Sequence, residues 1–133
     1  MGMIIMNGKE YAGSGSEWHE YSTEEKVVGK WIDGKPLYQK TLSFDNITIS
    51  ANGFITEDLS QFISDLDLAL FHKTVVMING SPTELPAVHA ANQLSSYNIS
   101  CVLTDNNLYL SRSSAGSITG DFKSTIWYTK TTD

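Results

Sequence analysis

The sequence predicts an all-β fold, an antiparallel β-sandwich of jelly-roll-like type with one short helical segment. The chain has 133 residues, of which 41% are hydrophobic and 18% charged, which is typical of one globular domain. Stretches rich in Val, Ile, Thr, Tyr and Trp alternate with clusters of Gly, Asn, Asp and Ser, as expected of strands joined by turns. Many short strands with little helix favour the sandwich. The predicted strands cover residues 27–32, 36–44, 47–50, 68–79, 99–104, 108–112 and 123–131.

The N-terminal residues are expected to stand apart from this domain. Residues 13–16 read "GSGS", and a Gly/Ser run of this kind behaves as a flexible linker. We therefore expect an N-terminal stub and flexible joint over residues 1–16, followed by the sandwich domain over residues 17–133.

A hairpin is predicted within "KWIDGKPLY", residues 30–38. Asp33 and Gly34 suit a two-residue type I′ turn, in which both central residues need a positive φ. Counting outward from this turn places Trp31 opposite Pro36 and Gly29 opposite Tyr38. Under this register Pro36 has no ladder hydrogen bond to lose, so it marks a locally unpaired edge.

The hairpin register also predicts which side chains point to the core, because paired residues share a face of the sheet. One face is apolar apart from a single lysine, and we expect it to be the core face. It carries Val27, Trp31, Pro36, Tyr38, Leu42 and Phe44, with Lys40 as the lysine. Residues 30–38 contain an acid, two lysines and aromatic rings, which could form a catalytic or binding site. The hairpin register favours a structural role for them instead.

The short helical segment is predicted over residues 57–66. Apolar residues recur there at helical spacing, at Leu59, Phe62, Ile63 and Leu66, and Thr56 or Asp58 is placed to cap the first turn. The segment runs directly into the β-branched stretch at residues 74–79, so we expect only one or two helical turns. That stretch, "TVVMIN", is apolar at both parities and predicts a strand buried on both faces, by the helix or by another subunit.

Composition argues against several classes of partner and site. The net charge of -6 is unfavourable for nucleic acid, which requires a clustered basic face. The single cysteine, Cys101, cannot form a disulfide within the chain and is expected to be a buried thiol in a strand. No apolar run reaches 18 residues, so membrane insertion is not expected.

No pattern of catalytic or ligating residues stands out. His19, His72 and His89 lack the spacing of metal ligands, and Asp65 with Asp67 lacks the further oxygen ligands of a calcium loop. The local signatures of hydrolases and nucleotide-binding enzymes are missing. We therefore expect no catalytic residues, no metal, no cofactor and no enzymatic activity.

Two segments resemble a known family. "YSTEEKVVGKWIDGKPLYQKTL", residues 21–42, and "STIWYTKTTD", residues 124–133, together about a quarter of the chain, are similar to the C-terminal β-rich domain of bacteriophage and prophage tail-fibre or other virion surface proteins, from phages of Gram-positive gut bacteria. The resemblance implies a distal virion domain that is often a homotrimer and has no established catalytic residues. It implies attachment to a bacterial cell-surface glycan or protein. The alternatives are a purely structural trimerisation or decoration module and a glycan-degrading enzyme.

Three residues are candidates for ligand or interface contacts. Trp18 and His19 follow the flexible run, and two interpretations stay open: an exposed Trp18 forms a contact site with His19, or Trp18 packs back on the domain. Strand alternation sets Ile126 and Tyr128 on one face and Trp127 on the other. If the first two are core, Trp127 faces solvent or another subunit.

Overall fold

The computed structural model describes residues 22–86 and 98–133. Trp18, His19 and the expected joint at residues 1–16 lie outside them. The described chain is almost entirely β-structure, with a single short 3-10 turn, so the predicted all-β class is confirmed. In chain order, the elements are β1 (Lys26–Lys30), β2 (Pro36–Ile49), β3 (Phe54–Asp58), η2 (Leu59–Gln61), β4 (Leu66–Ile78), β5 (Ser81–Leu85), β6 (Ile99–Thr104), β7 (Asn107–Arg112) and β8 (Ile118–Lys130).

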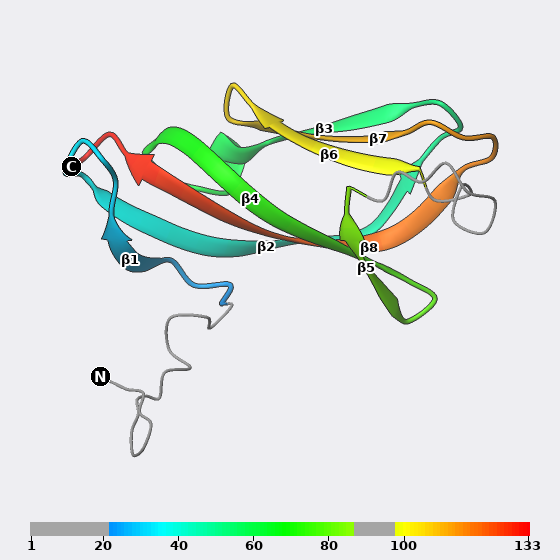
Figure 1. Cartoon of the computed structure of the whole chain (residues 1–133), viewed down its shortest axis with the longest axis horizontal. Helices are drawn as coiled ribbons and strands as arrows, with labels where there is room; N and C mark the ends of the chain where they lie inside the picture. Colours follow the sequence, from blue (N-terminus) through cyan, green and yellow to red (C-terminus); the bar gives the residue numbers. More distant parts are fainter. Residues whose placement is uncertain (1–21, 87–97) are drawn as a thin grey trace, which may run out of the picture.

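The strands form two antiparallel sheets that pack as a sandwich. Sheet A has the strand order β1-β2-β8-β4-β5, and sheet B has the order β3-β7-β6. Figure 1 shows sheet B lying along one face of the curled sheet A. The long strands β2, β4 and β8 form the centre of sheet A, so they carry both the core and the opposite, outward face.

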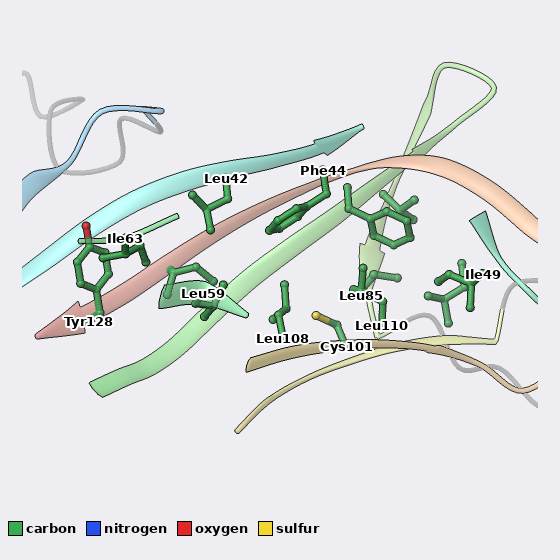
Figure 2. Close-up of a cluster of buried hydrophobic side chains, with 14 residues drawn as sticks. Leu42, Phe44, Ile49, Leu59, Ile63, Leu85, Cys101, Leu108, Leu110 and Tyr128 are labelled. Carbon is green, nitrogen blue, oxygen red and sulfur yellow. The ribbon is translucent and has the colours of Figure 1, made fainter. Parts of the chain in front are cut away.

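The core lies between the two sheets. Apolar side chains of β2, β4 and β8 meet those of β6, β7 and η2, as Figure 2 shows. Each such side chain, when fully buried, stabilises the fold by roughly 1.5–3 kcal/mol. The fully buried apolar residues with 0% exposure are Ile49, Leu59, Ile99, Leu108, Leu110, Ile126 and Tyr128.

Strands β3 and β5 were not predicted, and the two strands predicted at residues 36–44 and 47–50 form the single strand β2. β3 contains two acidic residues and leads into η2, and β5 contains Pro82 on an edge strand, so neither has the expected apolar alternation. β2 runs through Asp45 and Asn46 because a bulge between Phe44 and Ile47 absorbs them. Asn46 has a φ of 59°, which Asn tolerates better than most residues.

The predicted helix over residues 57–66 is reduced to the 3-10 turn η2. Its N-cap is Asp58, one of the two predicted caps, whose carboxylate accepts a hydrogen bond from the Ser60 N–H at 3.0 Å. Leu59 and Ile63 are buried at 0% and 2% exposure. The apolar spacing therefore indicates the burial of Leu59 and Ile63 at one end of the core. The segment is too short to sustain an α-helix.

The hairpin lies where it was predicted, but the prediction of a two-residue type I′ turn is wrong. The Trp31 N–H donates to the Lys35 carbonyl and the Gly34 N–H donates to the Trp31 carbonyl, both at 2.9 Å. The loop thus has three residues, with Gly34 at a φ of 88°, as in hairpins with a glycine in the left-handed region. Asp33 instead uses its carboxylate to accept from the Lys35 N–H at 3.0 Å.

The longer loop changes the register, so the predicted pairs Trp31–Pro36 and Gly29–Tyr38 are wrong. Pro36 pairs with Lys30 and Tyr38 pairs with Val27, with a bulge between Val27 and Gly29. Pro36 is the first residue of β2 and precedes the ladder with β8, which begins at Tyr38. Its missing N–H therefore costs no hydrogen bond in that ladder.

The predicted core face is correct along β2 and wrong for Trp31, and Val27 on β1 is 61% exposed rather than buried. Tyr38, Leu42 and Phe44 pack in or against the core. Lys40 shares this face, and its ammonium group donates to the Phe62 carbonyl at 2.9 Å. Trp31 instead contacts Phe71 on the other side of sheet A, because the three-residue loop turns its side chain away from the core.

A candidate binding face on the outer side of sheet A

The face of sheet A that points away from sheet B is called here the outer face. Paired residues of antiparallel strands share a face, so the partners of Trp127 and its alternating neighbours lie together on it. Among residues 22–86 and 98–133, no second sheet covers this face, because sheet B packs on the other side. Three successive rows across β2, β8 and β4 are Gln39–Trp127–Phe71, Thr41–Thr125–Lys73 and Ser43–Lys123–Val75.

An aromatic cluster lies at the first of these rows, where Trp127 and Phe71 are neighbours. Phe71 stacks on Trp127 with ring centroids 5.2 Å apart and 22° between the rings. Trp31 approaches Phe71 from the hairpin, with a centroid distance of 6.4 Å. Phe71 is 43% exposed, so part of its ring is accessible from solvent.

A pocket of about 260 Å³, the outer-face pocket, lies in the next two rows. It is lined by Thr41, Lys73, Val75, Lys123 and Thr125. The hydroxyls of Thr41 and Thr125 lie 2.8 Å apart in a hydrogen bond across the β2–β8 pair. Methyl and methylene groups form most of the wall, because the lysine stems lie along it while their ammonium groups reach outward.

Both lysines of the pocket are paired with carboxylates. The Lys73 ammonium lies 2.9 Å from Glu84 on β5, and the Lys123 ammonium lies 2.9 Å from Asp45. Lys123 also donates to the Ser43 hydroxyl. The hydrogen bond from Lys123, followed by that from Ser43, holds the pKa of Asp45 below its ordinary value. Two positive and two negative charges therefore flank the pocket.

Residues 74–79 account for part of this face. Thr74 and Val76 point into the core at 0% and 1% exposure, whereas Val75 and Met77 lie half-buried on the outer face. One face is therefore fully buried, as expected, and the other belongs to the surface just described. The helix predicted as a cover lies at the end of the core instead.

A second cluster, between the sheets, unites residues that are distant in sequence. His72 Nδ1 lies 2.9 Å from the Thr74 hydroxyl, which in turn lies 2.7 Å from the Ser124 hydroxyl. Cys101 Sγ is 3.6 Å from the Thr74 hydroxyl and 3.9 Å from His72 Nδ1. No sequence signal indicated this arrangement, because it depends on β6 crossing over β4.

The chemistry of this cluster is that of neutral groups. Burial raises the pKa of the Cys101 thiol to about 11, and burial lowers the pKa of His72. Both shifts disfavour the thiolate–imidazolium pair that activates a nucleophilic cysteine. Cys101 is thus a buried thiol in β6, as expected, within a hydrogen-bonded network.

The candidate residues of the sequence are distributed over different places. Trp127 lies on the outer face, and Trp31 joins it there rather than in the core. Asp33 and Gly34 lie in the three-residue loop of the hairpin. Sequence reasoning did not identify Phe71 or the two threonines, whose only signal is their alternation with buried neighbours.

No family model, curated protein or solved structure matches the chain. In the part of the chain that the structure describes, no group of three or more His, Cys, Asp and Glu residues is placed to hold a metal ion. No helix in that part has the length and apolarity needed to cross a membrane. The outer face, with its aromatic cluster and pocket, is therefore the candidate site defined by geometry.

Proposed function

We propose that the chain is the distal domain of a bacteriophage or prophage virion surface protein, and that it attaches to a saccharide on the bacterial surface through the outer face of sheet A. The observation that carries this proposal is the stacked pair Phe71–Trp127 beside the outer-face pocket. Aromatic rings pack against the C–H groups on one face of a sugar ring. The adjoining hydroxyl and charged groups would then orient the sugar.

The scaffold supports this assignment. The rows that form the face lie on β2, β8 and β4, which are the longest strands and are paired along most of their length. Side chains on such strands are held more firmly than side chains on loops, so the face is preorganised for binding. Binding through a strand face differs from the loop-borne specificity that the resemblance suggests.

The resemblance to tail-fibre domains supplies the virion context of the proposal. Its two segments, residues 21–42 and 124–133, are neighbours in space, because β2 pairs with β8 from Tyr38 opposite Tyr128 onward. They share one end of the sandwich and contribute Trp31 and Trp127 to the outer face. The two segments thus supply structural support and part of the proposed binding surface.

A homotrimer is part of the proposal, and a structural trimerisation module is its second candidate. The favouring observation is the exposure of apolar residues on the β1 hairpin: Val27 and Val28 on β1 are 61% and 42% exposed, and Ile32 in the hairpin loop is 90% exposed. Such residues are typical of subunit contacts when they gather. Light scattering at micromolar concentration tests this point, and a monomer would contradict the trimer.

Binding to purified cell walls of Gram-positive bacteria tests the attachment proposal. We expect the chain to co-sediment with such walls from a host strain and Phe71→Ala to weaken binding several-fold, up to about tenfold, as loss of an aromatic contact predicts. Tyr109→Ala is the matched control. Tyr109 pairs with Val102 on the side of sheet B that points away from sheet A, far from the outer face, and this variant should bind as the parent does. Equal loss in both variants, or no binding to any wall, would contradict the proposal.

A further inference from the structure

Each lysine of the outer-face pocket is matched by a carboxylate. Lys73 faces Glu84 and Lys123 faces Asp45, each pair at 2.9 Å. Asp121 adds a further carboxylate on the same face, where its Oδ1 accepts from the Asn46 N–H at 2.7 Å. The ammonium groups are therefore matched, and the surroundings of the pocket are not positive.

This balance is unfavourable for an anionic ligand. A phosphate or uronate group bound to either lysine would lie beside Asp45 or Glu84, and the two like charges would repel each other. Recognition of a charged polymer instead uses unopposed lysines and arginines. The chain as a whole carries a net charge of -6, which adds repulsion at long range.

The same groups suit a neutral ligand rich in hydroxyls. Each hydroxyl both donates and accepts, and a carboxylate paired with one ammonium keeps lone pairs for further donors. Asp45 and Glu84 offer acceptors, Lys123 offers a third N–H beyond those given to Asp45 and Ser43, and the Thr41 hydroxyl, which is hydrogen-bonded to that of the buried Thr125, adds a further polar group. The methyl and methylene wall fits the C–H edge of a sugar ring.

We infer that the outer-face pocket selects uncharged saccharide units, with Phe71 and Trp127 as the stacking surface and the two ion pairs as the groups that read hydroxyls. This inference rests on the proposed function, of which it names the ligand class. Asp45 and Glu84 are then positioned as ligand acceptors as well as partners of the lysines. Their side chains are 64% and 65% exposed, so they are accessible to a ligand.

The test compares neutral saccharides with anionic polymers and oligomers by isothermal titration calorimetry and on an immobilised panel. The neutral probes are hexose and N-acetylhexosamine oligomers, and the anionic probes are glycerol-phosphate polymer and uronate oligomers. We expect binding to a neutral probe that changes less than about twofold between roughly 50 mM and 500 mM salt, since no charge pair with the ligand is screened. Asp45→Asn and Glu84→Gln should each weaken it by about tenfold, as loss of a hydrogen bond to a charged group predicts.

Charge-changing variants separate this inference from the proposed function. If the chain binds only the uronate oligomers, loses them at high salt, and binds them more tightly as Asp45→Asn, the ligand class is wrong while attachment to a saccharide stands. If it binds only the glycerol-phosphate polymer, which contains no sugar ring, both the inference and the saccharide ligand of the proposed function are wrong. If the chain binds cell walls, but its affinity for every probe is the same in Asp45→Asn and Glu84→Gln as in the parent, the role assigned to the ion pairs is wrong. If it binds neither walls nor any probe, both the inference and the proposed function are wrong. Thr104→Ala, an exposed polar change on β6, is the control and should leave binding unchanged.

Discussion

Tyr38 on β2 stacks on Tyr128 on β8, with ring centroids 5.7 Å apart and 16° between the rings. The Tyr128 hydroxyl donates to Glu25, and the Tyr38 hydroxyl donates to Asp133 at 2.6 Å. The Lys130 ammonium also pairs with Glu25 at 2.8 Å. One polar and aromatic cluster thus links the residues before β1 to the last residues of β8, and it closes this end of the sandwich.

The first prediction concerns the pH dependence of stability through Glu25. Burial by itself raises the pKa of Glu25, but hydrogen bonds from Lys130 and Tyr128 together hold it below its ordinary value of 4.5. A lowered folded pKa adds stability that is present above about pH 4.5 and is lost as the pH falls through the folded pKa. Glu25→Gln should therefore lower the urea midpoint at pH 7 and have less effect near pH 3.

The control for this prediction is Glu24→Gln, which removes the same formal charge from the exposed neighbouring position. It should leave the difference between pH 7 and pH 3 as in the parent. A Glu25→Gln effect that is constant from pH 7 to pH 3 would contradict the assigned role of the carboxylate.

The second prediction concerns the hairpin loop. Gly34 has a φ of 88°, and a Cβ there would meet no atom within 4 Å. Gly34→Val should cost about 1–3 kcal/mol from backbone strain alone, measured by urea denaturation, because a β-branched residue resists positive φ. Gly29→Val is the matched control on β1, where a Cβ also has open space, and it should cost little. Equal midpoints for the two variants would refute the left-handed assignment of Gly34.

The third prediction concerns the buried hydroxyl pair of the core. Thr74 and Ser124 are both 0% exposed, and Thr74 also meets His72. Thr74→Val should destabilise the fold by roughly 1–3 kcal/mol, because it leaves the Ser124 hydroxyl and His72 Nδ1 without this partner. The double variant Thr74→Val/Ser124→Ala should cost less than the sum of the two single variants. Simple additivity in a double-mutant cycle would show that the two hydroxyls do not depend on each other.

The fourth prediction concerns the thiol of Cys101. Its pKa of about 11 leaves very little thiolate at pH 8, and the thiolate is the reactive form. An aromatic disulfide reagent should react with the native chain at least about a hundredfold more slowly than with the chain unfolded in urea. Cys101→Ala gives the blank for the measurement. Equal rates in the native and unfolded states would contradict the protection of the thiol by burial, and a faster rate in the native state would indicate an activated thiolate and make His72 the next residue to change.

Local pattern was sufficient for most strands and for the direction of their side chains. Ile126 and Tyr128 are fully buried and Trp127 lies on the other face, because alternation is a property of the extended backbone at each residue. The N-cap role of Asp58 at the start of η2 could also be predicted from the sequence, because an N-cap depends only on residues next to it in the chain. Edge strand β5 was missed because Pro82 and its polar neighbours carry no core pattern, and β3 because its acidic end, Glu57 and Asp58, was assigned to the start of the predicted helix.

Pairing between strands required the tertiary structure. A single residue more in the hairpin loop moved Trp31 from the core to the outer face, since a shift of one residue reverses the face of a side chain. The contact of His72 with Cys101 depends on the packing of sheet B over sheet A.

The sequence by itself determined that this protein is an antiparallel all-β chain, where its longer strands lie, and which residues of β2 and β8 face the core. These properties follow from steric and apolar preferences of residues near one another in the chain. Only the tertiary structure decided which residues share the outer face, and hence the stacking of Phe71 on Trp127 and the pocket between Lys73 and Lys123. Such contacts join residues about fifty positions apart, and their register depends on loops and bulges whose geometry is settled only when the sheets pack.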